Sequence, residues 1–208
     1  PIGKRAVVIG GGFIGLEMVE NLVHQGFKVT LLELADQILA PLDVEQSRAV
    51  EDGLRRHGVT LALGEAVTGF VQQASGEIAV QTKAGTTYPA NIVILALGVR
   101  PDTALAKSAG LQLGERGGIK VDEHMRTSDP DIYAVGDAVE VHDVVTGADT
   151  LLALAGPANR QGRIAADAMK GRSSRFRGVQ GTAILGLFGT TVAWTGASEK
   201  TLGRLGRD

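Results

Sequence analysis

The sequence predicts an α/β protein that begins with a Rossmann-like domain, in which a parallel sheet is accompanied by an antiparallel meander. Two observations support this prediction. An apolar strand, residues 7–9, runs directly into the spacing G-x-G-x-x-G formed by Gly10, Gly12 and Gly15. A second apolar strand, residues 28–32, ends at Glu33. In a Rossmann unit the glycine turn binds the pyrophosphate, and an acidic residue near the end of the second strand binds the ribose.

Each glycine of the turn has its own expected role. Gly10 permits the sharp turn, Gly12 lets the backbone approach a pyrophosphate, and Gly15 lets the following helix pack closely on the strand. The N–H groups at the start of that helix, with the positive end of its dipole, would hold the phosphates. The chain has 29 glycines, so a structural turn is the alternative reading. The apolar strand before the turn and the amphipathic helix after it favour a dinucleotide site.

The next elements continue the pattern of a nucleotide-binding domain. A helix is expected to begin at Asp43, which forms a capping box with Gln46, and to end near His57. Gly53 inside this helix is expected to cost about 1 kcal/mol relative to alanine. A short third strand is expected at residues 59–63.

Short alternating runs follow at residues 67–71, 77–82 and 86–88, separated by Ser-Gly and Ala-Gly pairs. They predict a small antiparallel meander in the place of a crossover helix. The almost unbroken apolar run 91–97 predicts a central parallel strand that is buried on both faces and ends at Gly98.

The second half of the chain has a different character. Residues 117–122 are expected to form a short strand, and residues 132–138 an apolar strand that contains Gly136 and Asp137 near its end. A carboxylate at the carboxyl end of a strand lies where open α/β sheets bind ligands. Asp137 could equally cap the turn that follows.

The remainder of the chain contains one further expected helix. A hairpin is expected from residues 139–141 and 149–152, and a helix from about residue 156. The last forty residues are expected to form strands separated by glycine turns, without a closing element.

Composition excludes several classes of function. The net charge is -2 and the pI is about 6.1, which argues against a nucleic-acid partner. There is no cysteine, so disulfides, thiolate metal sites and a dithiol redox centre are excluded, and the four histidines are too scattered to suggest a metal site. The uncharged stretch 178–198 suits strands better than a membrane helix. No signal peptide is evident after Pro1, so a cytoplasmic location without membrane contact is expected.

The order of motifs resembles one family. The chain is similar to the pyridine nucleotide-disulfide oxidoreductases, flavoproteins that bind two dinucleotides, and most to the branch of coenzyme A-disulfide reductases, NADH oxidases and NADH peroxidases. Five stretches carry the resemblance: residues 10–17, 29–39, 95–103, 127–138 and 155–163. Residues 188–200 also resemble the opening of the dimerisation domain of that branch.

The resemblance implies three domains. Residues 1–113 would form the NAD(H)-binding domain, residues 114–171 the C-terminal half of an FAD-binding domain, and residues 172–208 the start of a dimerisation domain. The implied activity passes hydride from NAD(P)H to FAD and on to a disulfide, peroxide or oxygen, in a homodimer.

The chain departs from the family in two ways. The glycine-rich motif of the first FAD-binding segment has no counterpart here, and neither does the redox-active cysteine of that segment. The sequence therefore resembles the central portion of a longer enzyme, and the missing N-terminal FAD segment would be its partner. It is expected to bind NAD(H), to bind FAD weakly or not at all, and to be inactive alone, so no catalytic residue is assigned.

The resemblance also assigns residues to the flavin. In relatives the acid of the Gly-Asp motif, here Gly136 and Asp137, holds the ribityl or pyrophosphate portion of FAD. The helix that begins near Ala155 would direct its N-terminus at the flavin ring, where the dipole favours negative charge. Arg160 and Arg163 could be flavin-side groups or ordinary surface charges.

Further residues are assigned to the nicotinamide dinucleotide. In relatives the acid that corresponds to Glu17 faces the junction of nicotinamide and flavin, and Gly98 would lie beside the nicotinamide. Phe13 and Ile14, inside the glycine motif, complete the cofactor-binding candidates. Without the resemblance, Glu17 would be read as a solvated charge on a helix.

Two other functions are compatible with parts of the pattern. A non-catalytic module that senses NAD would use the same glycine turn and the same Glu33. Glu33 could also be an ordinary solvated acid at the end of a strand. A methyltransferase that binds S-adenosylmethionine would also use a glycine turn and an acid. The meander before residue 91 and the motif at Gly136 argue against a methyltransferase.

Overall fold

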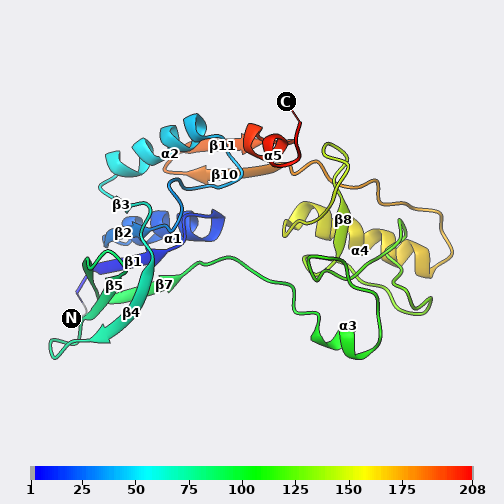
Figure 1. Cartoon of the computed structure of the whole chain (residues 1–208), viewed down its shortest axis with the longest axis horizontal. Helices are drawn as coiled ribbons and strands as arrows, with labels where there is room; N and C mark the ends of the chain where they lie inside the picture. Colours follow the sequence, from blue (N-terminus) through cyan, green and yellow to red (C-terminus); the bar gives the residue numbers. More distant parts are fainter. Residues whose placement is uncertain (1–2, 208) are drawn as a thin grey trace. The chain divides into compact units, whose positions relative to one another are not determined.

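The computed structural model describes residues 3–207, which form two compact units. The first unit comprises the chain up to Gly98, the segment Ile184–Ala193 and the segment from Ser198 onward. The second unit comprises Val99–Ala183 and Trp194–Ala197. In Figure 1 the colours of the first unit run from blue to green, with orange and red C-terminal segments, and the second unit is drawn mainly in green and yellow.

The first unit is built on a four-stranded parallel sheet. Its strands are β1 (Arg5–Ile9), β2 (Lys28–Leu32), β3 (Thr60–Ala62) and β7 (Ile92–Leu95), in the order β3-β2-β1-β7. Adjacent strands end in register, since Ile9 pairs with both Leu32 and Leu95. All four strands are parallel, so their carboxyl ends meet at one edge of the sheet. The predicted Rossmann-like sheet is confirmed.

Two helices connect these strands. α1 (Phe13–His24) links β1 to β2 and buries Leu16, Val19 and Leu22, and α2 (Val44–Arg56) links β2 to β3 and buries Leu54. The apolar residues of α1 recur every three or four positions, and so one face of the helix lies in the core.

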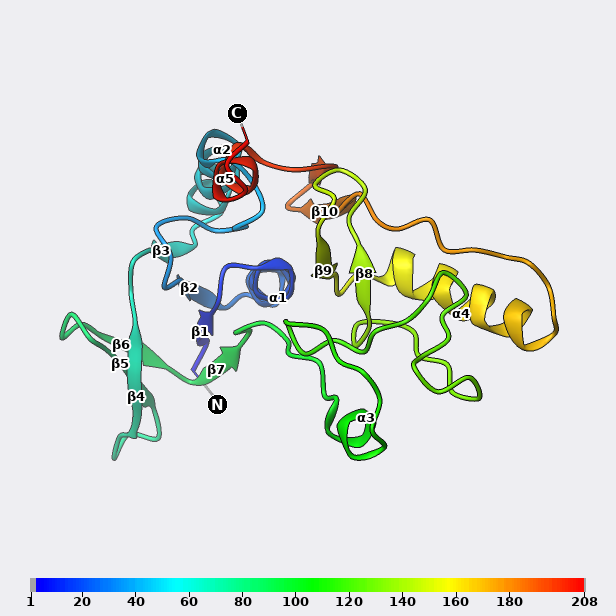
Figure 2. The same cartoon turned by 45° about the vertical axis from the view of Figure 1, so that its right-hand side comes forward.

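The meander is confirmed as a separate antiparallel sheet. It consists of β4 (Val67–Gln72), β5 (Ile78–Thr82) and β6 (Thr87–Ala90), in that order. Val80 and Ala90 are fully buried and share a core cluster with residues of β1 and β2. The meander therefore covers part of the parallel sheet, as a crossover helix would (Figure 2).

The prediction that residues 91–97 form a central strand is wrong. β7 is shorter than expected and lies at the edge of the sheet, where it pairs only with β1 within the described residues. Its residues are half-buried or exposed, and Leu95 is 59% exposed. A continuous apolar run is typical of a buried parallel strand, but the order of the strands depends on partners distant in the sequence.

The second unit has little regular sheet. It contains α3 (Ala104–Ser108), α4 (Ala155–Met169) and the hairpin of β8 (Glu140–His142) with β9 (Asp149–Leu151). The hairpin and the helix near residue 156 were predicted, whereas α3 was not. Two small apolar clusters hold the unit together, one around Met125 and Ile164 and the other around Val139, Val141 and Val179.

Two strands expected in this unit do not form. Residues 117–122 and 132–138 make only isolated bridges, such as Ile119 with Val139 and Arg126 with Tyr133. A strand needs successive bridged pairs along a neighbour, and the bridges of these stretches are single. Gly136 and Asp137 therefore lie in a loop.

The C-terminal segment forms a hairpin and a short helix. β10 (Ala183–Leu187) and β11 (Thr190–Trp194) are joined by Phe188 and Gly189, whose φ values of 49° and 77° are typical of a two-residue hairpin turn. The helix α5 (Glu199–Arg204) follows. The expectation that the chain finishes without a closing element is therefore wrong.

The predicted capping box is also wrong, because the Asp43 side chain caps a different helix. Asp43 occupies the backbone N-cap position of α2 but makes no side-chain hydrogen bond there. Its carboxylate accepts hydrogen bonds from the backbone N–H groups of Glu199 and Lys200, at 3.2 and 3.5 Å, in the first turn of α5. Lys200 in turn donates from Nζ to Gln37 Oε1 at 2.9 Å and to the Ala40 carbonyl at 3.0 Å. These bonds fasten α5 to the connector between β2 and α2.

Replacing Gly53 with alanine is expected to raise the free energy of unfolding by about 1 kcal/mol, because glycine is the poorer residue inside a helix. An added Cβ would meet only Arg56 Nη2, at 3.8 Å, which is an ordinary contact. Urea unfolding followed by circular dichroism would measure the difference. An equal or lower stability of the Gly53→Ala variant would contradict the prediction.

In the described part of the chain, no helix has both the length and the apolar character needed to cross a lipid bilayer.

Candidate functional site

A cavity of about 600 Å³ lies at the carboxyl edge of the parallel sheet in the first unit. The segments that follow all four strands line it: Gly10–Gly12 after β1, residues 33–35 after β2, residues 65–67 after β3, and residues 96–98 after β7. The connector residues 37 and 39–41 complete the wall, together with Phe70 of the meander. We call this cavity the edge cleft. Ligands of open α/β sheets bind at this position.

Gly10 and Gly15 are required by the fold itself. Gly10 has φ of 110°, a conformation that other residues rarely adopt, and a Cβ there would overlap the Ala96 carbonyl oxygen. A Cβ on Gly15 would overlap the carbonyl oxygen of Gly10. The helix α1 therefore starts as close to β1 as the backbone allows.

Gly12 differs from Gly10 and Gly15 because neither its backbone conformation nor its surroundings in the chain require a glycine. Its φ is -84° and its ψ -172°, an extended conformation open to any residue, and no atom lies within 4 Å of an added Cβ. Gly12 stands at the N-cap of α1 and faces the edge cleft. The space that a side chain would fill is thus left free beside the N–H groups of the helix start, as a bound pyrophosphate requires.

The Glu33 carboxylate is held at the floor of the edge cleft by two backbone groups. Its Oε2 accepts a hydrogen bond from Gly11 N at 2.5 Å, and its Oε1 accepts one from Ala35 N at 2.9 Å. These bonds fix the carboxylate between the glycine turn and the strand end. Each oxygen keeps a second lone pair for a hydroxyl donor.

Glu65 is a residue of the cleft that the sequence reading missed. It follows β3 as Glu33 follows β2, and the two segments run side by side because Glu65 N donates to the Glu33 carbonyl at 3.0 Å. Burial, and secondarily the nearby Glu65 carboxylate, raise the pKa of the Tyr88 hydroxyl above its usual value. The only feature of the sequence that could have indicated Glu65 as a cleft residue is that an acid directly follows Gly64, and acidic residues are common in loops.

The far end of the edge cleft lies beyond β7. Gly98 lines it with φ of 89°, and Leu97 before it is 72% exposed. This end therefore presents apolar surface next to a glycine with open space beside it, which suits a flat ring.

Not every predicted cofactor residue lies in the edge cleft. Gly10, Gly12, Glu33 and Gly98 line it, whereas the remaining candidates of the first unit do not: Phe13, Ile14, Gly15 and Glu17. The Glu17 side chain is exposed on α1.

The candidates of the second unit gather around α4. Gly136 has φ of 87°, and its N–H donates to Gln161 Oε1 at 2.7 Å, so the buried Gln161 ties the Gly-Asp loop to α4. The Asp137 side chain is exposed, and so is Ala155 in the first turn of α4. The sequence reading missed Gln161, because an isolated glutamine in a helix carries no pattern.

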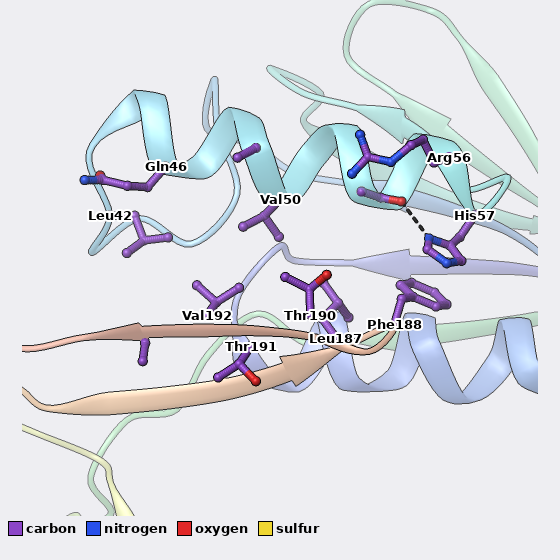
Figure 3. Close-up of a pocket in the computed structure, with 13 residues that line it drawn as sticks. Leu42, Gln46, Val50, Arg56, His57, Leu187, Phe188, Thr190, Thr191 and Val192 are labelled. Carbon is purple, nitrogen blue, oxygen red and sulfur yellow. Dashed lines mark hydrogen bonds between the residues drawn. The ribbon is translucent and has the colours of Figure 1, made fainter.

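A second cavity, of about 330 Å³, lies between α2 and the hairpin of β10 and β11 in the first unit (Figure 3). At one end the ring of His57 stacks on Phe188 with centroids 4.2 Å apart, and its Nδ1 lies 2.8 Å from the Gly53 carbonyl oxygen. Figure 3 shows Val50 on the helix facing Val192 on the hairpin. None of the predicted site residues lines this cavity.

No group of three or more histidine, aspartate or glutamate side chains suited to a metal ion occurs among residues 3–207.

Comparison with known proteins identifies the family. The family described as "Pyridine nucleotide-disulphide oxidoreductase" matches residues 1–162. An NADH oxidase of Enterococcus faecalis is 39% identical over 199 residues, which are 95% of this chain and 44% of that protein. A CoA-dependent NAD(P)H sulfur oxidoreductase of Pyrococcus abyssi is 38% identical over 94% of this chain and 44% of that protein. The chain thus spans less than half the length of these curated relatives.

Solved structures agree with this result. The reduced CoADR-RHD of Bacillus anthracis has a TM-score of 0.93 and 47% sequence identity to this chain. The match covers 99% of this chain and 36% of the Bacillus chain. The water-forming NADH oxidase of Lactobacillus brevis, solved with NADH bound, has a TM-score of 0.92 and 33% identity over 98% of this chain and 45% of its own. The family match and these similarities show that this chain belongs to the pyridine nucleotide-disulphide oxidoreductase family.

Proposed function

We propose that this chain is the NADH-binding portion of an FAD-dependent oxidoreductase, which passes hydride from the nicotinamide to FAD and on to a disulfide, a peroxide or oxygen. The observation that carries this proposal is the open space at Gly12, beside the N-terminus of α1 and the Glu33 carboxylate, within one cleft. These three features match the pyrophosphate and the adenosine ribose of a dinucleotide.

The residues of the chain would bind and orient the dinucleotide. The N–H groups at the start of α1 would donate to the pyrophosphate oxygens, and Glu33 would accept hydrogen bonds from the ribose hydroxyls. Gly98, after β7, would leave room for the nicotinamide ring. Bound FAD would supply the electron-accepting chemistry, while the chain would supply orientation and exclude water.

We further propose that the site prefers NADH to NADPH. A carboxylate at the ribose repels a 2′-phosphate, and like charges brought together in a site cost several kcal/mol. A variant of the Lactobacillus oxidase supports this reasoning. Its five substitutions remove one aspartate and introduce two arginines, and it is described as an NADPH oxidase bound to NADPH.

We propose the domain limits 1–113 for NAD(H) binding, 114–171 for the second half of an FAD-binding domain, and 172–208 for the start of a dimerisation domain. The family match over residues 1–162 spans the first of these domains and most of the second. In the second domain Gly136, Asp137 and the helix start at Ala155 would contact FAD. We also propose that the complete protein is a cytoplasmic homodimer and that this chain alone binds FAD weakly.

Two measurements test the proposal. Titration of the chain with NADH, followed by the fluorescence of the reduced nicotinamide, should show saturable binding at one site. The same chain purified with added FAD should carry far less than one flavin per chain. Absence of NADH binding by the folded chain would overturn the proposal. One FAD per chain in a monodisperse monomer would overturn the idea that the chain is only part of a flavoprotein.

A kinetic experiment separates the enzyme from a non-catalytic NAD sensor. In the proposed longer protein that contains this chain, NADH added anaerobically should bleach the visible absorbance of the oxidised flavin. NADH binding without bleaching would favour the sensor.

A further inference from the structure

The Glu65 side chain, beside the edge cleft, has an unmet hydrogen-bonding requirement. Its Oε2 atom is shielded from solvent and has no hydrogen-bond partner among residues 3–207. Buried polar atoms are nearly always paired in folded proteins, and an unpaired carboxylate oxygen is among the least favourable exceptions. Glu65 also lines the edge cleft, so a rotation of its carboxylate would turn the unpaired oxygen toward a ligand in the cleft.

The strand order places Glu65 at one end of a series. Along the carboxyl edge, Gly98 follows β7, the glycine turn follows β1, Glu33 follows β2 and Glu65 follows β3. If the pyrophosphate lies at the glycine turn and the adenosine ribose at Glu33, the group one strand further on is the adenine base. Neighbouring strands lie about 4.8 Å apart, which is close to the step from a ribose to its base.

We propose that the Glu65 carboxylate accepts a hydrogen bond from the exocyclic 6-amino group of adenine and so selects the base of the dinucleotide. This inference rests on the proposed NADH-binding function. An ionised carboxylate only accepts hydrogen bonds, and the 6-amino group is the donor on the outer edge of adenine. Val67 and Phe70, which follow Glu65 and also line the cleft, supply apolar surface for the faces of the base.

The test compares two dinucleotides whose bases differ at position 6. In reduced nicotinamide hypoxanthine dinucleotide, the 6-amino group of NADH is replaced by a carbonyl oxygen, which would face the Glu65 carboxylate as a second acceptor, and the neighbouring N1 gains a proton. The unmodified chain should bind NADH at least about tenfold more tightly, because a hydrogen bond to a charged group would be lost and an acceptor left opposed. Fluorescence titration measures both dissociation constants.

Variants assign the preference to Glu65. In Glu65→Gln the amide can present either oxygen or nitrogen, so the preference should fall to about threefold or less, through weaker NADH and stronger hypoxanthine binding. Glu45→Gln removes the same charge from an exposed position in the first unit, outside the cleft lining, and should leave the preference unchanged. Tyr88→Phe should also leave it unchanged, which separates base recognition from a structural pairing of Glu65 with Tyr88.

The outcomes separate the two proposals. Equal affinity of the unmodified chain for both dinucleotides would overturn the role of Glu65 and leave NADH binding intact. A full preference in folded Glu65→Gln would overturn it as well. Absence of NADH binding by the unmodified chain would overturn the proposed function, and the base contact with it.

Discussion

Replacing Gly12 with valine is expected to abolish NADH binding while the chain stays folded. The valine side chain would occupy the space beside the start of α1 that the pyrophosphate needs. Loss of two charge-assisted hydrogen bonds to phosphate, each worth about 1.5–3 kcal/mol, corresponds to roughly a hundredfold weaker binding or more. Fluorescence titration with NADH would measure the change.

The structure explains why this variant should fold. No atom lies within 4 Å of an added Cβ at Gly12, and its extended backbone suits a β-branched residue. Loss of glycine at a helix N-cap costs about 1 kcal/mol or less. Circular dichroism and thermal unfolding should therefore remain close to those of the parent chain. Unchanged NADH affinity in the folded variant would refute the assignment of the glycine turn.

A matched pair of glycine variants completes this experiment. A methyl group on Gly15 would overlap the Gly10 carbonyl oxygen, so Gly15→Ala should lower stability by about 1–3 kcal/mol, as overpacking does. Gly53→Ala, in a helix outside the edge cleft, should not weaken NADH binding. Of the three variants, only Gly12→Val is expected to lose NADH binding while it keeps the stability of the parent chain.

Removing the charge of Glu33 is expected to reduce the preference for NADH over NADPH. We expect the parent chain to bind NADPH roughly a hundredfold more weakly, because a carboxylate facing a 2′-phosphate costs several kcal/mol. Glu33→Gln should narrow the preference to about tenfold or less, and Glu33→Arg should narrow it further or invert it. Titration of each variant with both dinucleotides provides the measurement.

Glutamine is the informative replacement at this position. Glu33 also accepts hydrogen bonds from Gly11 N and Ala35 N, and an alanine would leave both groups without this partner. A glutamine oxygen can keep one of them, so a change in preference reports the charge and not a collapsed turn. Glu45→Gln provides the control for charge removal elsewhere on the first unit. Equal affinity of the parent chain for NADH and NADPH would exclude Glu33 from this role.

The sequence was most informative where structure depends on near neighbours. The glycine turn, the strand before Glu33 and the short strands of the meander each follow from a few consecutive residues, and all were predicted. Of the cleft residues, Gly10, Gly12 and Glu33 could be named from such local patterns and Gly98 from the resemblance to the family, and the structure brings them together.

Predictions failed where distant segments decide the outcome. The apolar run before Gly98 looked central, but only strand order determines that β7 is an edge. Asp43 matched a local capping pattern, yet its carboxylate bonds to backbone groups of α5, more than 150 positions away in the chain. Glu65 had no visible role, because its significance lies in an unpaired oxygen that only the packing of the cleft creates.

The connector between β2 and α2 has a thermodynamic consequence for ligand binding. Residues 33–43 contain no helix or strand, but Leu39 N bonds to the Gly11 carbonyl at 2.9 Å, and Ser47 Oγ bonds to the Ile38 carbonyl at 2.8 Å. Ile38 and Leu39 are fully buried, and Lys200 holds the next turn. Immobilising a free loop costs about 1–2 kcal/mol per residue in conformational entropy. Since folding has already ordered this wall, a dinucleotide that enters the edge cleft forms its contacts without that entropic penalty.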